Sequence, residues 1–214
     1  MVVNFLSPKQ QSWYQSIESK RDVRQYGKME FVMASKAREE LQRRLDDVDE
    51  LIKAHGQLTG AQRGRPRDRK GAAVTRAGVV LLAAATEAYV EDLFEESAEL
   101  IFRNMAGADL EKLFKNTSRR MNNADVHKIE MLYFNLGLAW VLGDIRWKKF
   151  SNCSFRKGLN NLVQARNKVA HGKNPNIRLN MLKRWKNMIE MFSPKLEQKI
   201  KSHIRQLTGQ YPNW

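Results

Sequence analysis

Apolar residues recur every three or four positions along most of the 214-residue chain, which is the spacing of one face of an α-helix. Between Met29 and His55 this spacing makes a single apolar stripe in a charge-rich segment, and Gly56 is expected to end that helix. The run Ala77–Ala85 is apolar on every side, as in a helix that other helices enclose. No segment alternates apolar and polar residues between hairpin turns. The pattern therefore predicts an all-α protein.

Capping and helix-breaking residues divide the rest of the chain. Ser193-Pro194 is expected to separate the last two helices, because proline inside a helix removes a backbone hydrogen bond. Besides 29–55, helices are expected over 7–25, 72–104, 109–116, 124–132, 143–149, 154–170, 177–192 and 193–207. The organisation we predict is N-terminal helices packing on the bundle (1–56), a basic loop (57–71), a main helical domain (72–208) and a tail (209–214).

The formal net charge of +15 is concentrated in one third of the chain. Residues 146–205 hold sixteen Lys and Arg against two Asp and Glu. Such a region attracts polyanions, and nucleic acid is the commonest of these, with an anionic membrane surface as the alternative. The single cysteine, Cys153, excludes an internal disulfide and argues against a structural zinc site. The apolar run is too short to span a bilayer, and we expect no signal peptide because the first residues lack the basic-then-apolar order of one. We therefore expect a cytoplasmic protein without membrane, metal or cofactor.

Arg166 and His171 lie at the end of a predicted amphipathic helix, in Gln-Ala-Arg-Asn-Lys-Val-Ala-His-Gly. Asn167 follows the arginine directly and lies one turn before His171 on the same face. A second arginine–histidine pair, Arg120 and His127, occurs in a polar connector that no apolar stripe precedes. The helix end and the basic surroundings favour Arg166 and His171. The alternative is that His171 only ends a helix and that Arg166 pairs with a carboxylate.

This segment resembles the signature of HEPN ribonucleases, in which a short spacer with a polar first residue separates arginine from histidine at a helix end. The earlier run Leu81–Leu93, alanine-rich and then Glu-Ala-Tyr with further acids, resembles the bacterial RiboL-PSP branch of that family. The resemblance implies a HEPN-like antiparallel helical bundle, here with additional N- and C-terminal helices. It also implies a metal-independent endoribonuclease that works as a homodimer. A toxin or phage-defence role, with an antitoxin or defence-system partner protein, is implied in the same way.

Cleavage of RNA needs no metal if the 2′-hydroxyl is the nucleophile, because proton transfer and positive charge at the phosphate then suffice. An imidazole changes charge near neutral pH, so His171 suits the proton transfer. The guanidinium of Arg166 can bind two phosphate oxygens, and Asn167 is expected to hold the phosphate or orient the imidazole. Glu87 is expected to be partly buried and to hold Arg166, with a solvated acid as the alternative. Tyr89 is a second supporting candidate, with a core position as the alternative.

Basic residues on both sides of the candidate pair are expected to bind RNA. They are Lys168, Lys173, Lys183, Arg184 and, in the basic loop, Arg63, Arg65 and Arg67. The loop sequence Gln62–Arg67 resembles the core of an AT-hook, so a DNA-binding protein is one alternative function. A non-catalytic HEPN-like module that binds RNA, a nucleotide or another protein is the other. Trp147, Trp185 and Tyr133 lie near basic residues and are candidates for stacking on unpaired bases, with a core position as the commoner interpretation. The cluster 183–186, which includes Trp185, is the exception that is expected to be best exposed.

Overall fold

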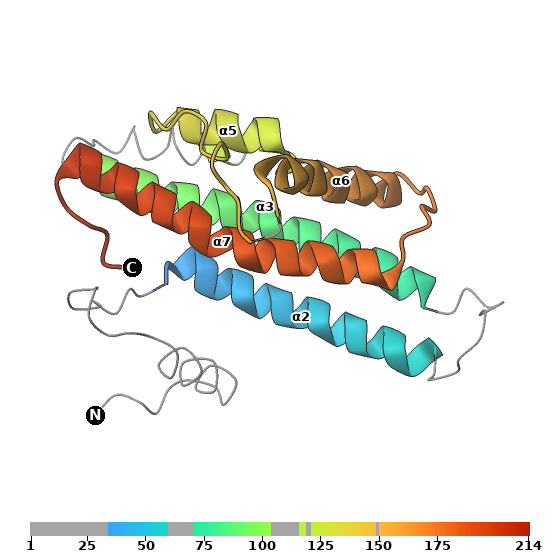
Figure 1. Cartoon of the computed structure of the whole chain (residues 1–214). Helices are drawn as coiled ribbons and strands as arrows, with labels where there is room; N and C mark the ends of the chain where they lie inside the picture. The colour runs from blue at the N-terminus through green and yellow to red at the C-terminus, as the bar shows by residue number, and fades with distance from the viewer. Residues whose placement is uncertain (1–33, 60–70, 104–115, 119–120, 149) are drawn as a thin grey trace, which may run out of the picture. The chain divides into compact units, whose positions relative to one another are not determined.

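The computed structural model describes residues 34–59, 71–103, 116–118, 121–148 and 150–214, and residues 34–214 belong to one folded unit. Five helices account for most of this part: α2 (Lys36–Thr59), α3 (Ala72–Phe102), α5 (Val126–Phe134), α6 (Asn152–Ala170) and α7 (Leu179–Thr208) (Figure 1). A helical turn covers 116–118. The described residues contain no strand, and their single β-bridge pairs Trp147 with Phe150. The prediction of an all-α fold is therefore confirmed.

Helix α3 lies at the centre of the bundle, where it packs against α2, α5, α6 and α7. It runs in the same sense as α7 and opposite to α2 (Figure 1). At Gly78 the two parallel helices come so close that a Cβ atom would lie 2.6 Å from Leu182 Cδ2. By length and composition alone α3 could also cross a membrane. Its side chains Leu82, Leu93 and Phe94 are fully buried, so we interpret this composition as that of an enclosed core helix.

The start of α2 is tied to α3 and α7 by two carboxylates. Glu197 of α7 is 2% exposed. It accepts a hydrogen bond from the backbone N–H of Ser35 (2.9 Å) and forms an ion pair with Arg38 (2.6 Å). Glu96 of α3 accepts from the backbone N–H of Ala37 (2.7 Å). Several donors therefore satisfy the buried charge of Glu197, and α2 is part of the bundle.

Helix α6 carries the candidate pair and its two ends are well defined. Ser151 caps its start by accepting from the backbone N–H of Ser154. At its other end His171 is the C-cap residue, and Gly172 follows with a φ of 71°. The N–H groups of Gly172 and Lys173 donate back to the carbonyls of Val169 (3.0 Å) and Lys168 (2.9 Å), which is a Schellman motif. The predicted helix 154–170 is confirmed, with a start two residues earlier.

The predicted break at Ser193-Pro194 is wrong, because α7 continues through both residues. Pro194 is exposed, so its ring meets solvent rather than a neighbouring helix. The carbonyl of Glu190, which loses its usual N–H donor, accepts instead from Ser193 Oγ at 3.4 Å. The hydroxyl of Tyr89 donates to the carbonyl of Ser193 (2.8 Å), which fixes this part of α7 against α3.

Two other expectations about helix limits are also wrong. Gly56 does not end α2, which continues to Thr59, where the Thr59 hydroxyl donates to the carbonyl of His55 (2.9 Å). The described part of the segment predicted as a helix over 143–149, residues 143–148, forms turns and one β-bridge position instead, and Asn152 Nδ2 donates to the carbonyls of Ile145 (3.0 Å) and Leu142 (2.6 Å). The helices expected over 7–25 and 109–116 lie outside the described residues, apart from Asn116.

Candidate active site

The guanidinium of Arg166 is held by two amide side chains. Its Nη1 donates to Asn123 Oδ1 at 2.8 Å and to Asn167 Oδ1 at 3.1 Å, and the arginine is partly buried. Both acceptors are neutral, and no carboxylate of the described residues lies within ion-pair distance of Arg166. Within the described part of the chain, therefore, neutral groups orient the side chain and no carboxylate offsets its charge.

Asn123 is the residue of this site that the sequence did not indicate. It has a φ of 79°, in the left-handed region that asparagine tolerates better than most residues. Its backbone N–H donates to Glu87 Oε1 at 2.8 Å, while its side chain accepts from Arg166. The expected direct pairing of Glu87 with Arg166 is therefore wrong, and Glu87 acts on the arginine through Asn123. The preference of asparagine for positive φ is the one signal in the sequence that could have pointed to it.

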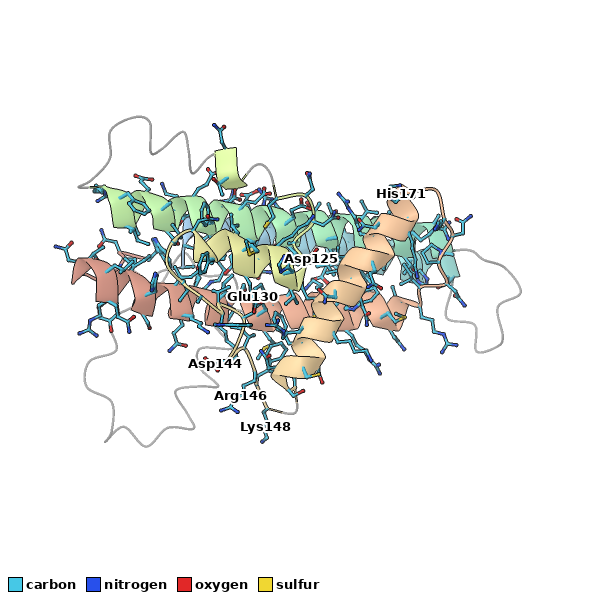
Figure 2. All side chains as sticks on the ribbon, turned by 90° about the horizontal axis from the view of Figure 1, so that it is seen from above. Asp125, Glu130, Asp144, Arg146, Lys148 and His171 are labelled. Carbon is cyan, nitrogen blue, oxygen red and sulfur yellow. The ribbon has the colours of Figure 1, made fainter. Side chains whose placement is uncertain are left out.

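His171 is exposed at the end of α6 (Figure 2). Its backbone N–H donates to the carbonyl of Asn167, one turn earlier. Arg166 precedes His171 by five residues, which corresponds to about 140° around the helix axis and about 7.5 Å along it. One chain therefore presents the arginine and the histidine on different sides of the same helix end, with Asn167 between them.

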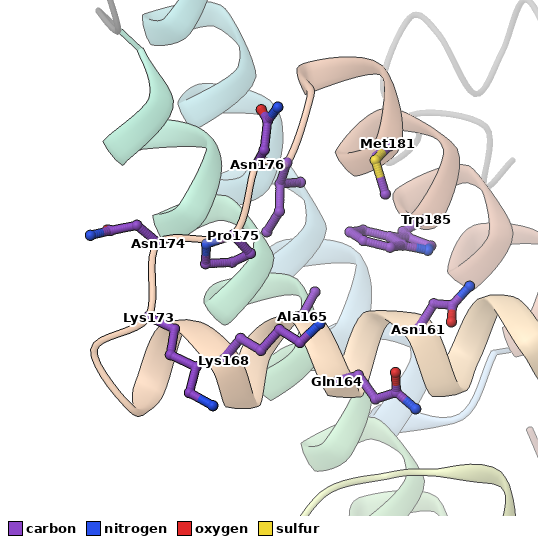
Figure 3. Close-up of a pocket in the computed structure, with 11 residues that line it drawn as sticks. Asn161, Gln164, Ala165, Lys168, Lys173, Asn174, Pro175, Asn176, Met181 and Trp185 are labelled. Carbon is purple, nitrogen blue, oxygen red and sulfur yellow. The ribbon is translucent and has the colours of Figure 1, made fainter.

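Lys168 and Lys173 lie beside a cavity of about 490 Å³ on the other side of α6 (Figure 3). The walls come from α6, the segment 173–177 and the first turns of α7. Lys183 and Arg184 are exposed on α7 but do not line this cavity. The expected contacts of Arg63, Arg65 and Arg67 lie outside the described residues.

The aromatic candidates belong mainly to the core. Tyr89 is fully buried and lies edge-to-face with Phe192 at 6.4 Å, and burial raises the pKa of its hydroxyl well above the ordinary value. Tyr133 is also fully buried and donates to the carbonyl of Val90 (3.1 Å). Trp147 stacks on Phe150 with ring centroids 4.6 Å apart. The supporting role expected of Tyr89 thus reduces to packing in the core.

The expectation that residues 183–186 form the most exposed cluster is wrong for two of them. Trp185 is 7% exposed. Lys186 is also buried and forms ion pairs with Asp49 (3.1 Å) and with Glu190. These neighbours raise the pKa of the Lys186 ammonium despite the opposing effect of burial. The four residues span one turn of α7, so they lie on different faces of the helix. Trp185 and Lys186 face the bundle, whereas Lys183 and Arg184 face solvent.

A stripe of acids on α3 lies beneath the segment that carries Asn123. Glu87 accepts from Asn123, and Glu95 accepts from Ser118 Oγ at 2.6 Å. Between them, burial and then the neighbouring carboxylates Glu87, Asp92 and Glu95 raise the pKa of Glu91 from 4.5 to about 7. The stripe is therefore part of the packing under the site rather than a row of fully solvated acids.

The second arginine–histidine pair gains no support from the structure. His127 is exposed on α5, and Arg120 lies outside the described residues. Within the described part of the chain, no group of three or more His, Cys, Asp or Glu side chains is placed to bind a metal ion.

The all-helical fold and the arginine and histidine at the end of α6 agree with the HEPN resemblance of the sequence. The model of the family described as RiboL-PSP-HEPN matches residues 39–202, and the chain belongs to that family. The match extends from the first turn of α2 to the last turns of α7 and includes Asn123, Arg166 and His171. No curated protein and no solved structure matches the chain.

Proposed function

We propose that this protein is a metal-independent endoribonuclease whose catalytic residues are Arg166, Asn167 and His171. Domains of its family are commonly ribonucleases. The observation that carries the proposal is the state of Arg166, which two neutral amides hold in place without cancelling its charge. An arginine held only for stability would be expected to face a carboxylate. A guanidinium oriented by neutral groups, at the same helix end as an exposed histidine, suits the binding of a phosphodiester.

In the proposed reaction the 2′-oxygen of RNA attacks the adjacent phosphorus and the bond from phosphorus to the 5′-oxygen breaks. A base removes the proton of the 2′-hydroxyl, and an acid returns a proton to the departing 5′-oxygen. Arg166 stabilises the negative charge that builds up on the non-bridging oxygens. The products are a 2′,3′-cyclic phosphate and a 5′-hydroxyl. His171 is exposed, so RNA can reach it from solvent, and its imidazole can carry out one of the two proton transfers.

A homodimer would supply the other proton transfer. One chain carries one His171 at the end of α6, on a different side from Arg166, so a second copy of this helix end can contribute the missing group. We therefore propose that two α6 ends meet across a shared cleft. On dilution below the dimer dissociation constant, the cleavage rate per chain should fall together with the molar mass measured by light scattering. A constant rate for the monomer would contradict the shared cleft.

The test of the activity uses single-stranded RNA in EDTA, with product ends identified by mass. Arg166→Ala and His171→Ala are each expected to lower the cleavage rate by roughly 10² to 10⁴-fold, the range for losing one proton-transfer or charge-stabilising group. His127→Ala is the matched control, since it removes an exposed histidine from α5 and should leave the rate unchanged. Intact RNA with the wild-type protein, or cleavage that survives both substitutions, would overturn the proposal.

We also propose a toxin or phage-defence role with a neutralising partner protein, on the basis of the family resemblance, and a cytoplasmic location, on the basis of the single cysteine. Growth arrest on expression, relieved by His171→Ala, is the result that this role requires. A non-catalytic module that binds RNA or a nucleotide is the second candidate, favoured by the cavity beside Lys168. The AT-hook-like loop lies outside the described residues, so DNA binding remains a prediction from sequence.

A further inference from the structure

The cavity between α6 and α7 is the feature that the proposed chemistry leaves unused. Arg166 points from α6 toward Asn123, whereas Asn161, Gln164 and Lys168, spaced three and four residues apart on the same helix, line the cavity. Helix α6 therefore separates two environments: the amide-held arginine on one side and this cavity on the other. Figure 3 shows the cavity between the end of α6 and the start of α7.

We infer that this cavity binds one unpaired nucleotide of the RNA, next to the phosphate that reaches His171. The identification of the ligand as RNA rests on the proposed function, while the chemistry of the cavity itself indicates a base with an attached phosphate. Its volume of about 490 Å³ lies within the range of roughly 300 to 1,000 Å³ that is usual for small-ligand sites. A single nucleotide is a ligand of suitable size.

The apolar part of the cavity suits the flat face of a base. Trp185 and Met181 of α7 and Pro175 of the preceding segment line this part (Figure 3), together with Ile177. Trp185 is 7% exposed and is therefore held rigidly by the core, whereas Met181 is 40% exposed and can adapt to the ligand. Contact between a base and an aromatic side chain accepts any of the four bases, so this part provides affinity without selection.

The polar part of the cavity suits the edge of a base and a phosphate. Four of the residues that line it carry an amide side chain: Asn161, Gln164, Asn174 and Asn176. Each amide offers both donors and an acceptor, which is what recognition of a base edge requires. Lys168 and Lys173 supply two ammonium groups, and none of the residues that line the cavity is acidic. This charge favours an anionic ligand over a neutral or cationic one.

The cavity and the candidate catalytic histidine share one turn of backbone. The N–H of Lys173 donates to the carbonyl of Lys168 at 2.9 Å, and His171 lies within the turn that this hydrogen bond closes. A nucleotide held by the two lysines would therefore have its neighbouring phosphate at the end of α6. It follows that cleavage should depend on the identity of one base beside the broken bond.

The test measures binding in a His171→Ala background, so that affinity is separated from cleavage. Fluorescence anisotropy would compare eight-residue homopolymers of A, C, G and U. One base is expected to bind on the order of tenfold more tightly than the weakest, the range for one good amide–base contact. Gln164→Ala combined with Lys168→Ala should abolish this preference. Both side chains are exposed, so the fold should be unaffected, which circular dichroism would verify.

Lys157→Ala is the matched control, because it removes one exposed lysine of α6 outside the cavity. It should weaken all four homopolymers equally and keep the preference. Equal affinity for all four, or a preference that persists in the double variant, would overturn the inference. Tighter binding of a nucleoside monophosphate than of any RNA would show that the ligand of the cavity is a free nucleotide and not RNA. If wild-type protein does not cut RNA but the double variant loses the preference, the proposed function fails and the cavity assignment stands.

Discussion

The two ends of α6 hold an arginine in opposite ways. Near the N-terminal end, Arg156 forms a two-pronged ion pair with Glu130 of α5, with Nη2 to Oε2 at 3.2 Å and Nη1 to Oε1 as the second contact. Near the C-terminal end, the acceptors of Arg166 among the described residues are both amide oxygens. The comparison distinguishes Arg156, whose charge is paired with a carboxylate of another helix, from Arg166, whose described acceptors are neutral. Residue type and helix are the same, so the acceptors make the difference.

The largest expected effect comes from replacing each arginine by lysine. Arg166→Lys keeps the charge but loses the planar fork that bonds two amides and a phosphate together, and the cleavage rate should fall roughly 10²-fold or more. Arg156→Lys should change the rate less than twofold, and lower the stability by about 1 kcal/mol or less. Initial rates on single-stranded RNA and urea unfolding would measure both. Equal losses of rate would show that the two arginines do not differ in role.

Asn123 offers a sharper test of how Arg166 is positioned. Asn123→Gly keeps the positive φ and the backbone bond to Glu87 but removes the amide oxygen that Arg166 contacts. We expect the rate to fall on the order of tenfold, the loss of one charge-assisted hydrogen bond, with a stability change of less than about 1 kcal/mol. Asn123→Ala should show the same loss of rate and an added loss of stability of about 1 kcal/mol from strain at positive φ.

Positioning through Arg166 also predicts how the loss is divided. In an Arg166→Ala background, Asn123→Gly should have no further effect on the rate. A tenfold loss in that background as well would mean that Asn123 acts by another route.

Gly172→Ala tests whether the turn at the end of α6 places His171. Its φ is 71° and nothing lies within 4 Å of the position of an added Cβ, so the expected cost is backbone strain of about 1 kcal/mol. Gly209→Ala is the matched control, with a φ of 74° and equally open surroundings at the end of α7. Both variants should lose similar stability in thermal unfolding, but only Gly172→Ala should lose activity. Loss of activity in both would indicate a general effect of destabilisation.

The smallest effect concerns the acids beneath Asn123. The pKa of Glu91 is raised to about 7 in the folded protein, so the folded state binds more protons than the unfolded state between the two pKa values. The contribution of Glu91 to the free energy of unfolding should therefore be greatest below about pH 4.5. It should be lost as the pH rises through about 7. Glu91→Gln should remove this fall, with a gain at pH 8 of less than about 1 kcal/mol because solvent screens the group.

Unfolding midpoints in urea at pH 5 and pH 8 would show the difference. Glu99→Gln, which changes a largely exposed acid of the same helix, should leave the pH dependence as in the wild type. If Glu91→Gln were less stable than the wild type at pH 8, the carboxylate would have a stabilising partner in the folded protein.

Much of the fold could be predicted from local pattern. The limits of α6 follow from its apolar stripe and from Gly172, and the enclosed position of α3 follows from a run that is apolar on all sides. The predictions at Pro194 and Gly56 were wrong because such residues end a helix only where no other contact offsets their effect on the backbone. Ser193 Oγ and the exposed ring supply that compensation at Pro194, and neighbours in space rather than in sequence decide it.

Less of the candidate site could be predicted. Arg166, Asn167 and His171 lie within one helix end, so a local motif was enough to select them. The amide cradle involves Asn123, 43 residues away from Arg166, and depends on how the segment after residue 120 crosses α3 and α6. Glu87 was expected to contact Arg166 directly. It accepts instead from the backbone N–H of Asn123, because backbone N–H groups compete with side chains for carboxylates. The cavity likewise requires the packing of α6 on α7.

The proline within α7 has a consequence for hydrogen exchange. Pro194 contributes no amide hydrogen, and the carbonyl of Glu190 is bonded by a hydroxyl at 3.4 Å instead of by a backbone N–H. The ladder of backbone bonds along α7 is therefore interrupted in its middle, although the helix is continuous in shape (Figure 1). Its two halves can open as separate units, with different exchange protection. Both halves contact α2, the first through Lys186 and the second through Glu197, so exchange protection on either side of Pro194 would show which half responds to a ligand.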